Sequence, residues 1–529
     1  MPENFYVQLI LPLKLQWEPW YSSETELYPG KRVNVIFSHR RYTAVVHRCS
    51  GVPDVPANRV SPIIGVAEGM PDISARELEL WEFISSYYLC TIGEVYKAAY
   101  PLGKIRSEEV APRAMERLRE RIARLEAEID RRGGSSRCNA NVTARLTAEK
   151  NGLLAQLEAL CGEGSRRGTQ KAAHTPGKPV LLNGKDRTQY YLDAIGKADS
   201  DVLILVPDFV SGDILYSRLK ESLPEIIRTD SRNTAPQRRK AAELVRSSVS
   251  KTIILGTRAD IFLPFSKLSL VIVDEEQDSS YKQEDPAPRY NGRDCAVKLA
   301  QIHGAQVILG TSLPSLDSLY NCLSGRYTQV DLPGEGSPAQ AQIVDIAAEK
   351  RKNGMAGVLS RKVLDAAAGY PGKVVLVRGW EKDDEIARAA ELLGRPDIGV
   401  IRWRQLAETP LEDCLVVVLQ ADALVSKEDF RADEKALHIL DKLRSRCGSF
   451  ILQTSVPERF NSSRSLRDLL KERRQFGFPP YTRLVQTRKK DGKETTGMHF
   501  LKKDAGLAAA KKALLGTISA EDIIDVDPL

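Results

Sequence analysis

The sequence lacks the features that bind zinc, build a disulfide framework or cross a membrane. Its eight cysteines are scattered over 529 residues and no two form a C-x-x-C pair, so we expect free thiols in a reducing compartment and no zinc. No stretch approaches the roughly 18 unbroken apolar residues of a membrane helix. The start, Met1-Pro2-Glu3-Asn4, has no basic patch before an apolar core. We therefore expect no signal peptide, no membrane partner and a cytoplasmic location.

The composition is that of a folded protein with unevenly distributed charge. Apolar residues make up 42% of the chain and charged residues 28%, which excludes a wholly disordered or fibrous chain, and the length predicts about three or four domains. The formal charge is +7, yet residues 464–512 alone hold 14 Lys and Arg against 5 Asp and Glu. This basic segment indicates a polyanion partner or, equally well, a solvated charged surface.

Residues 1–103 are predicted to form a β-rich domain closed by a helix. Segments 7–11 and 30–37 have the composition of strands, and Ser74 with Glu77 three residues later matches a helix capping box.

Residues 104–177 have a different character. Apolar residues recur every three or four positions through 115–129 and again through 146–160, around a Gly-Gly-Ser-Ser turn. This spacing predicts an antiparallel helical hairpin, followed by a polar, basic linker. The apolar stripe would form the hairpin's own seam or, if unpaired, a dimer contact.

Residues 178–331 and 332–460 alternate short apolar strands with helices. The expected strands are 180–182, 202–206, 252–255, 270–273 and 307–309 in the first segment, and 374–377, 414–419 and 450–452 in the second. Fully apolar strands between helices imply parallel sheets covered on both faces. The predicted fold class is therefore α/β, with two tandem doubly wound lobes and a small basic C-terminal domain over residues 461–529.

The chemistry of the first lobe is expected at the carboxyl ends of its strands. The strand 270–273 runs directly into Asp274 and Glu275. An apolar strand ending in paired acids is the Walker B arrangement, in which the first acid holds Mg²⁺ and the second orients or deprotonates water.

The phosphate-binding loop should follow the first strand of this lobe. The candidate nucleotide-binding residues there are Gly184, Lys185, Arg187 and Thr188. A P-loop needs successive small residues whose N–H groups face the phosphates, then Lys and Ser or Thr. This segment has one glycine and places Asp186 where phosphate would approach, and a carboxylate repels a triphosphate. We therefore expect a nucleotide-binding sheet whose phosphate loop is damaged.

Longer strings resemble one family. Residues 256–265 are GTRADIFLPF, residues 271–290 are VIVDEEQDSSYKQEDPAPRY, residues 429–434 are DFRADE and residues 472–481 are ERRQFGFPPY. In this order they closely resemble the primosomal replication-restart DNA helicases (primosomal protein N′, PriA) of superfamily 2. The resemblance covers most of the chain, except about 104–176 and the tail after about 490.

The resemblance implies an N-terminal domain that binds the 3′ end of a nascent strand, two RecA-like lobes that bind ATP and Mg²⁺, and a C-terminal domain that contacts branched DNA. It implies as partners single-strand-binding protein and other primosome components. Asp274, Glu275 and Arg446 would be the catalytic residues. The candidate DNA contacts, from an aromatic-rich loop and the basic C-terminal segment, are Lys282, Arg289, Tyr290, Arg293, Arg473, Arg474, Arg488, Lys489 and Lys490.

Several departures from the family fall on ATP binding and hydrolysis. The phosphate loop is three residues shorter, so that Arg187 stands for the family's lysine. The last helicase motif keeps Arg446 but has Ser449 in place of a second arginine, and such an arginine can be worth about 10³-fold in rate. The family's zinc insertion is missing, and the hairpin replaces its winged-helix domain. A degenerate member without cofactor is therefore expected.

Three functions remain open at this point. The first is a replication-restart protein that binds branched or 3′-ended DNA, with lost or weak ATPase and helicase activity. The second is an active ATP-dependent 3′→5′ DNA helicase that uses Lys185 or Arg187 in an unorthodox loop. The third is a scaffold for replisome proteins in which DNA binding has lapsed.

Overall fold

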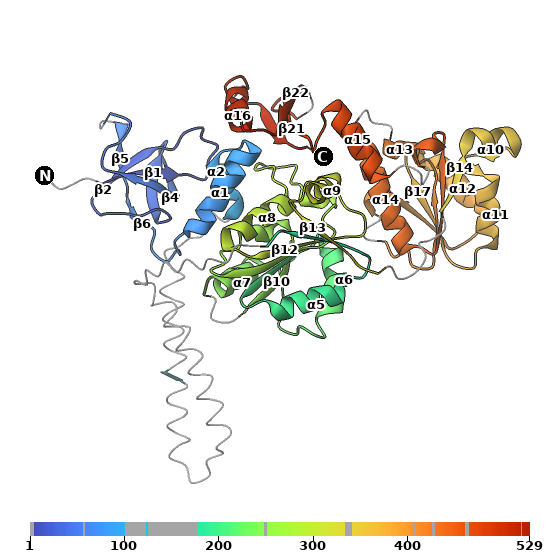
Figure 1. Ribbon diagram of the computed structural model, residues 1–529, viewed down its shortest axis with the longest axis horizontal. Coiled ribbons are helices and arrows are strands. Elements are labelled where there is room, and N and C mark those ends of the chain that lie inside the picture. Colours follow the sequence, from blue (N-terminus) through green and yellow to red (C-terminus); the bar gives the residue numbers. More distant parts are fainter. Residues whose placement is uncertain are drawn as a thin grey trace, which may run out of the picture. The chain divides into compact units, whose positions relative to one another are not determined.

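The structure is a computed structural model, drawn as a ribbon in Figure 1. The chain divides into two compact units. The first unit is built from 1–82, 91–175 and 243–249, and the second from 83–90, 176–242 and 250–529. The described residues are 5–56, 59–100, 123–124, 177–247, 251–333, 341–405, 409–425, 429–460, 465–492, 494–519 and 521–528. The hairpin expected over 104–177 lies outside them, apart from 123–124, and the domain boundaries drawn from the sequence stay predictions.

The first unit contains a six-stranded sheet in the order β5-β2-β1-β4-β3-β6, antiparallel except for the β2–β5 pair. Its core comes from alternate residues of β1, β3 and β4, as expected of strands with one buried face. The elements of residues 5–100 are β1 (Phe5–Ile10), β2 (Trp20–Ser23), β3 (Arg32–Phe37), β4 (Arg40–Ser50), β5 (Ser61–Pro62), β6 (Gly65–Val66), α1 (Ala75–Tyr88), which the unit boundary divides after Glu82, and α2 (Ile92–Ala99).

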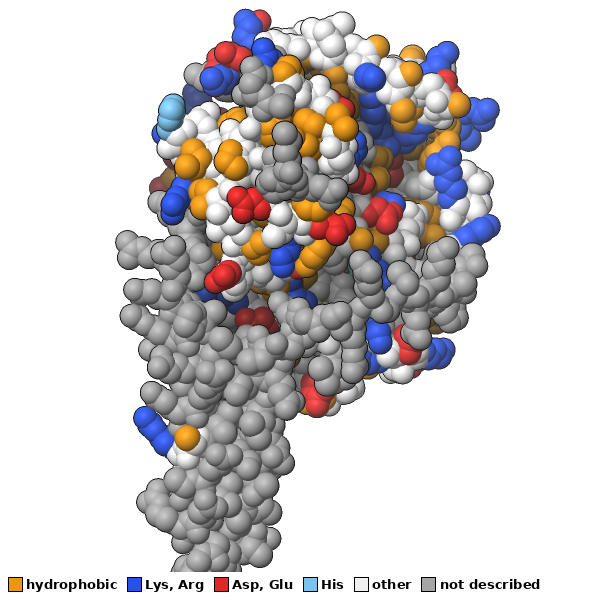
Figure 2. All heavy atoms as spheres, turned by 90° about the vertical axis from the view of Figure 1, so that its left-hand side faces the viewer, with side chains coloured by type: hydrophobic (Ala, Val, Ile, Leu, Met, Phe, Trp, Pro, Cys, Tyr) orange, Lys and Arg blue, Asp and Glu red, His pale blue; other side chains and the backbone are white. Residues whose placement is uncertain are grey.

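Helix α1 begins at the predicted capping box. The Glu77 N–H donates to the Ser74 hydroxyl at 3.2 Å, and the Ser74 N–H donates to the Glu77 carboxylate at 2.8 Å. Figure 2 shows hydrophobic side chains at the surface of the β-rich sheet, intermixed with charged ones.

Lobe 1, in the second unit, is a seven-stranded parallel sheet in the order β13-β7-β12-β11-β8-β10-β9. All five strands expected from the sequence are present within it. Its elements are β7 (Val180–Asn183), α5 (Thr188–Lys197), β8 (Asp201–Leu205), α6 (Phe209–Leu219), β9 (Ile227–Arg228), α7 (Ala235–Ser247), β10 (Ile253–Gly256), η2 (Arg258–Phe262), β11 (Leu268–Val273), η3 (Ser279–Tyr281), α8 (Gly292–His303), β12 (Gln306–Thr311), α9 (Leu316–Leu323) and β13 (Thr328–Asp331).

Lobe 2 is a second parallel sheet, ordered β14-β20-β19-β17-β18. Alternate residues of β17 and β19 enter two separate apolar clusters, one on each face, which confirms the predicted double covering. Its elements are β14 (Ala341–Asp345), α10 (Ile346–Lys352), β15 (Met355–Ala356), β16 (Leu359–Ser360), α11 (Arg361–Gly369), β17 (Val374–Arg378), α12 (Asp383–Leu393), β18 (Ile398–Arg402), η4 (Trp403–Gln405), β19 (Leu415–Val418), α13 (Asp422–Val425), α14 (Ala432–Arg446), β20 (Ser449–Thr454) and η5 (Pro457–Arg459).

The C-terminal segment packs on lobe 1 through an apolar cluster that joins Leu316 and Leu319 of α9 to Leu469 and Leu470 of α15. It then forms an antiparallel sheet in the order β22-β21-β23. The elements are α15 (Leu466–Phe476), β21 (Thr482–Arg488), β22 (Thr495–Lys502), α16 (Leu507–Leu515) and β23 (Ile523–Val526). None of the described helices is long and apolar enough to span a bilayer.

Candidate functional site

The candidate site lies at the carboxyl ends of β7, β11 and β12, where one buried arginine meets the two acids. The Arg187 side chain is 6% exposed, and its Nε and Nη2 lie 2.9 and 2.8 Å from Oδ1 of Asp274. Nη2 also pairs with Glu275, and Nη1 donates to the carbonyl of Gly184 at 2.5 Å. The guanidinium therefore occupies the space between the phosphate-loop segment and both acids.

The charges around Arg187 stabilise its protonated form. Burial lowers the pKa of this guanidinium, but the negative charges of Asp274 and Glu275 outweigh burial and hold the pKa well above its ordinary value. The arginine is thus a permanent cation, with its charge compensated by the two acids that a Walker B motif would offer to Mg²⁺.

Two main-chain N–H groups of the phosphate-loop segment, those of Gly184 and Thr188, donate to partners within the protein. The Gly184 N–H donates to the carbonyl of Thr311 at 2.9 Å, which extends the pairing of β7 with β12. The Thr188 N–H, at the start of α5, donates to the carboxylate of Asp186 at 3.1 Å. That bond is the main cause of the lowered pKa of Asp186. A side-chain carboxylate thus takes the position at the helix N-terminus that a phosphate would occupy.

Two residues of this site were missed by the sequence analysis. Tyr191, one turn after Arg187 on α5, donates its hydroxyl to Asp274 at 2.6 Å. Gly310 of β12 lies against both side chains, and a methyl group at Gly310 would overlap the Tyr191 hydroxyl. The i, i+4 spacing of Arg187 and Tyr191 was the available signal, because it places both on one face of a helix.

ATP with Mg²⁺ does not fit the residues as they are arranged here. The first acid already receives Arg187 and Tyr191, the single glycine of the loop is engaged in the strand ladder, and an aspartate caps α5. The remaining loop candidate, Lys185, is exposed.

A second buried network continues from the acidic strand end. Glu276 accepts Arg293 Nη1 at 3.0 Å, the Ser315 N–H at 2.8 Å and the Ser318 hydroxyl at 2.8 Å. Gln277 donates to Glu275 and accepts the Thr311 hydroxyl, each at 2.7 Å. The strand ends of β11 and β12 are therefore held together by polar side chains.

Helix α14 of lobe 2 bonds directly to lobe 1 within the second unit. Asp441 accepts the Ser312 hydroxyl at 2.7 Å, and Glu434 accepts the Leu316 N–H at 2.9 Å. Arg446, the candidate arginine finger at the end of this helix, donates to the carbonyl of Thr409 in its own lobe at 3.1 Å.

The structure buries four of the nine candidate DNA contacts. Lys282 binds Asp525 at 2.7 Å, and Arg473 binds Glu434 at 3.0 Å. Tyr290 donates to the carbonyl of Arg258 at 3.3 Å, and Arg293 belongs to the Glu276 network. These four side chains are buried in this structure and bind partners within the protein, whereas contact with DNA was expected of them. The others reach the surface fully or in part: Arg289, Arg474, Arg488, Lys489 and Lys490.

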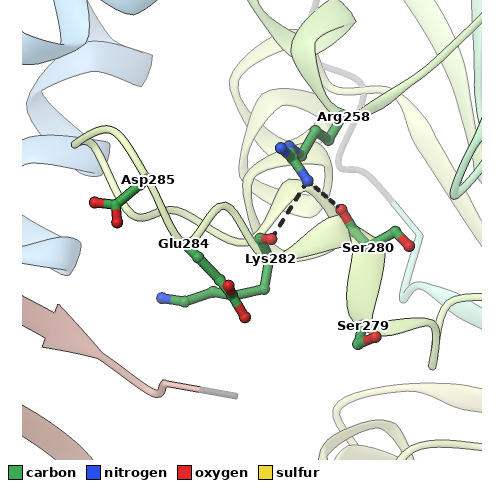
Figure 3. Close-up of a pocket in the computed structure, with 6 residues that line it drawn as sticks. All are labelled: Arg258, Ser279, Ser280, Lys282, Glu284 and Asp285. Atoms are coloured by element: carbon green, nitrogen blue, oxygen red, sulfur yellow. Dashed lines mark hydrogen bonds between the residues drawn. The ribbon is translucent and has the colours of Figure 1, made fainter. Parts of the chain in front are cut away.

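A shallow hollow of about 430 Å³ opens beside the loop that follows β11 (Figure 3). Arg258 reaches across it to the carbonyls of Ser280 and Lys282, at 2.6 and 3.4 Å. Glu284 and Asp285 also line it, so its charge is mixed and it resembles no anion site. Among the described residues, no group of three or more His, Cys, Asp and Glu side chains could hold a metal ion.

Comparisons with known proteins agree on one family. Residues 8–101 match the family model described as the 3′ DNA-binding domain of PriA. The chain is 26% identical over 370 residues to the replication restart protein PriA of Rickettsia prowazekii, covering 66% of this chain and 49% of that protein. It is 33% identical over 189 residues to PriA of Chlamydia trachomatis, covering 35% and 25%.

Solved structures of helicases are among those that resemble this chain. RecG bound to a three-way DNA junction matches with a TM-score of 0.35 and 14% identity, over 89% of this chain and 74% of that one. The Escherichia coli DExH-box NTPase HrpB matches with a TM-score of 0.34 and 14% identity, over 65% and 47%.

The two parallel sheets, with paired acids at the end of β11, define a helicase-like protein with two RecA-like lobes. The match to a 3′ DNA-binding domain model and the PriA relatives make the resemblance more specific. The chain is thus similar to PriA, and it spans about half the length of the relatives that match most of it.

Proposed function

We propose that this chain is a replication-restart protein that binds branched or 3′-ended DNA without an ATP-driven motor. The match of residues 8–101 to a 3′ DNA-binding domain supports the DNA part. The basic segment 464–512 supplies charge that would bind phosphates without reading sequence. Single-strand-binding protein and other primosome components are proposed partners, on the family resemblance.

One observation supports the loss of the motor above the others. Arg187 forms ion pairs with both Asp274 and Glu275 inside the lobe. For ATP and Mg²⁺ to bind in the family's manner, this guanidinium would have to leave two acids and a carbonyl. The desolvated ion pairs oppose that movement, because separating buried charges costs about 3–5 kcal/mol.

The experiment compares DNA affinity with ATP turnover on the full chain. Fluorescence anisotropy would measure binding to a forked DNA with a 3′-hydroxyl, to the same fork with a 3′-phosphate and to plain duplex, each with and without ATP and Mg²⁺. We expect the 3′-hydroxyl fork to bind most tightly and ATP to change nothing. Absence of any DNA binding at low salt would instead favour the scaffold.

The alternative of an active helicase is tested by DNA-stimulated phosphate release and strand displacement. We expect neither above the blank. Turnover that disappears in Asp274→Ala, measured beside the exposed control Asp365→Ala, would contradict the proposal. The two variants also identify a contaminating ATPase, because its phosphate release would be the same in Asp274→Ala and Asp365→Ala.

A further inference from the structure

Four phenylalanine rings form a continuous array where lobe 2 meets the C-terminal sheet. Phe430 and Phe478 stack with centroids 4.8 Å apart and planes 19° apart. Phe476 lies 6.0 Å and Phe500 5.5 Å from Phe478. These separations fall within the range over which aromatic rings attract. We call this set the phenylalanine array.

The outer part of the phenylalanine array is open to solvent. Phe476 is 64% and Phe500 40% exposed, and Met498, two positions before Phe500 on β22, is 51% exposed. Side chains two apart on a strand share a face, so Met498, Phe500 and Lys502 form one exposed row. Large exposed apolar side chains that gather in one region are typical of interaction sites.

The charge around the phenylalanine array suits an anionic partner. The guanidinium carbon of Arg431 lies 4.9 Å from the Phe430 ring centroid. Arg474 and Lys502 are exposed on α15 and β22. The segment that carries most of the array has 14 basic against 5 acidic residues. Aromatic faces beside cations bind bases and phosphates together.

We propose that the phenylalanine array stacks the bases of single-stranded nucleic acid, with Lys502 contacting a phosphate. A single strand fits better than a duplex, because only unpaired bases present their faces to a ring. This rests on the proposed function and deepens it: 3′-end binding would be assigned to residues 8–101, and the adjoining single strand to the array.

The test uses the full chain and a fluorescein-labelled oligothymidylate of about 15 nucleotides, within the usual range of site sizes. We expect Phe476→Ala and Phe500→Ala each to weaken binding about 5- to 100-fold, the usual effect of losing one stacked base. Phe500→Trp should keep the affinity, and its fluorescence should be quenched by the bound strand. The matched control is Leu515→Ala, whose side chain is as exposed as Phe500 but lies on α16.

The proposed contact between Lys502 and a phosphate is tested by the salt dependence of binding. Lys502→Gln should lower the slope of log affinity against log salt by about 0.7, the value for one phosphate contact on a single strand. Unchanged oligothymidylate binding in the Phe476→Ala/Phe500→Ala double variant would overturn this proposal. So would loss of self-association in that variant, because the array would then bind a second copy. Fork binding that persists in either case leaves the proposed function standing.

Discussion

Arg187 is buried in the structure and forms ion pairs with two acids that are distant in the sequence. Its position in the short loop predicts a weak grip on phosphate, and that expectation needs only the local residues. Its partners do not follow from the sequence, because Asp274 and Glu275 lie 87 and 88 residues away and the rotamer of a long side chain depends on packing. The sequence therefore predicts a damaged loop, whereas the structure shows an internal ion pair in its place.

Removal of the Arg187 side chain should show whether it occupies the position of a divalent cation beside Asp274 and Glu275. In Arg187→Ala the buried carboxylate of Asp274 loses its counter-charge, and we expect the free energy of unfolding to fall by about 3 kcal/mol. Because the two acids would then be available to a divalent cation, millimolar Mg²⁺ should raise the melting temperature of the variant and leave the wild type unchanged. Differential scanning fluorimetry measures both.

Arg361→Ala is the matched control for that experiment. Arg361 pairs with Asp365 in full solvent, so its loss should cost less than about 1 kcal/mol and give no response to Mg²⁺. A wild-type protein that is already stabilised by Mg²⁺ would contradict the interpretation of Arg187.

From the environment of His47 we predict that the stability of the first unit depends on pH. It is buried between Glu18 and Glu82, at 2.5 and 2.8 Å. Burial lowers the pKa of His47, but the bonds to the two carboxylates outweigh burial and raise it above 6.5. The stabilisation is therefore complete below the unfolded value of about 6.5 and is lost as the pH rises through the higher folded value.

Urea unfolding followed by tryptophan fluorescence between pH 6 and 9 checks this prediction. His47→Gln should remove the decline, whereas His39→Asn, at an exposed turn between β3 and β4, should preserve it. A wild-type stability that rises over this interval would show that the bridging carboxylates do not hold the proton.

At the scale of elements, the buried strands could be predicted and the edge strands could not. Strands β8, β11 and β19 are buried on both faces, so their sequences are continuous apolar runs. The edge strand β9 has two residues and β18 is only partly buried, and their sequences lack that signal. The C-terminal sheet was also missed, because its exposed rows are polar at several positions.

Helix α14 is joined to two other helices by the side chain of Glu434. Glu434 holds both the start of α9 and the buried Arg473. Glu434→Ala should lower the unfolding free energy by about 2–4 kcal/mol, because Arg473 keeps its charge without its carboxylate. Glu434→Gln should cost less, since an acceptor oxygen remains. Urea titrations measure both, and a loss below about 0.5 kcal/mol for the alanine variant would contradict this role.

For the DNA affinity of the whole molecule, we expect the uneven distribution of charge along the chain to be more important than the net charge. The surplus in residues 464–512 exceeds the total of +7, so the rest of the chain is close to neutral or slightly acidic. We expect DNA affinity to fall steeply with salt and to depend on this segment.

Lys490 and Lys352 make a matched pair for that expectation, since both are exposed lysines. Lys490→Gln, in the basic segment, should reduce the salt slope of fork binding by about 0.9, whereas Lys352→Gln in lobe 2 should not change it. Anisotropy titrations between about 50 and 200 mM salt give the slopes. Equal slopes for the two variants would place the phosphate contacts elsewhere.

The guanidinium between Asp274 and Glu275 belongs to the chain itself, so it cannot be consumed, exchanged or diluted. On the proposed function, a protein arranged in this way has no resting and energised forms to alternate between. Its affinity for DNA would then be the same in a starving cell, where ATP is scarce, as in a growing one.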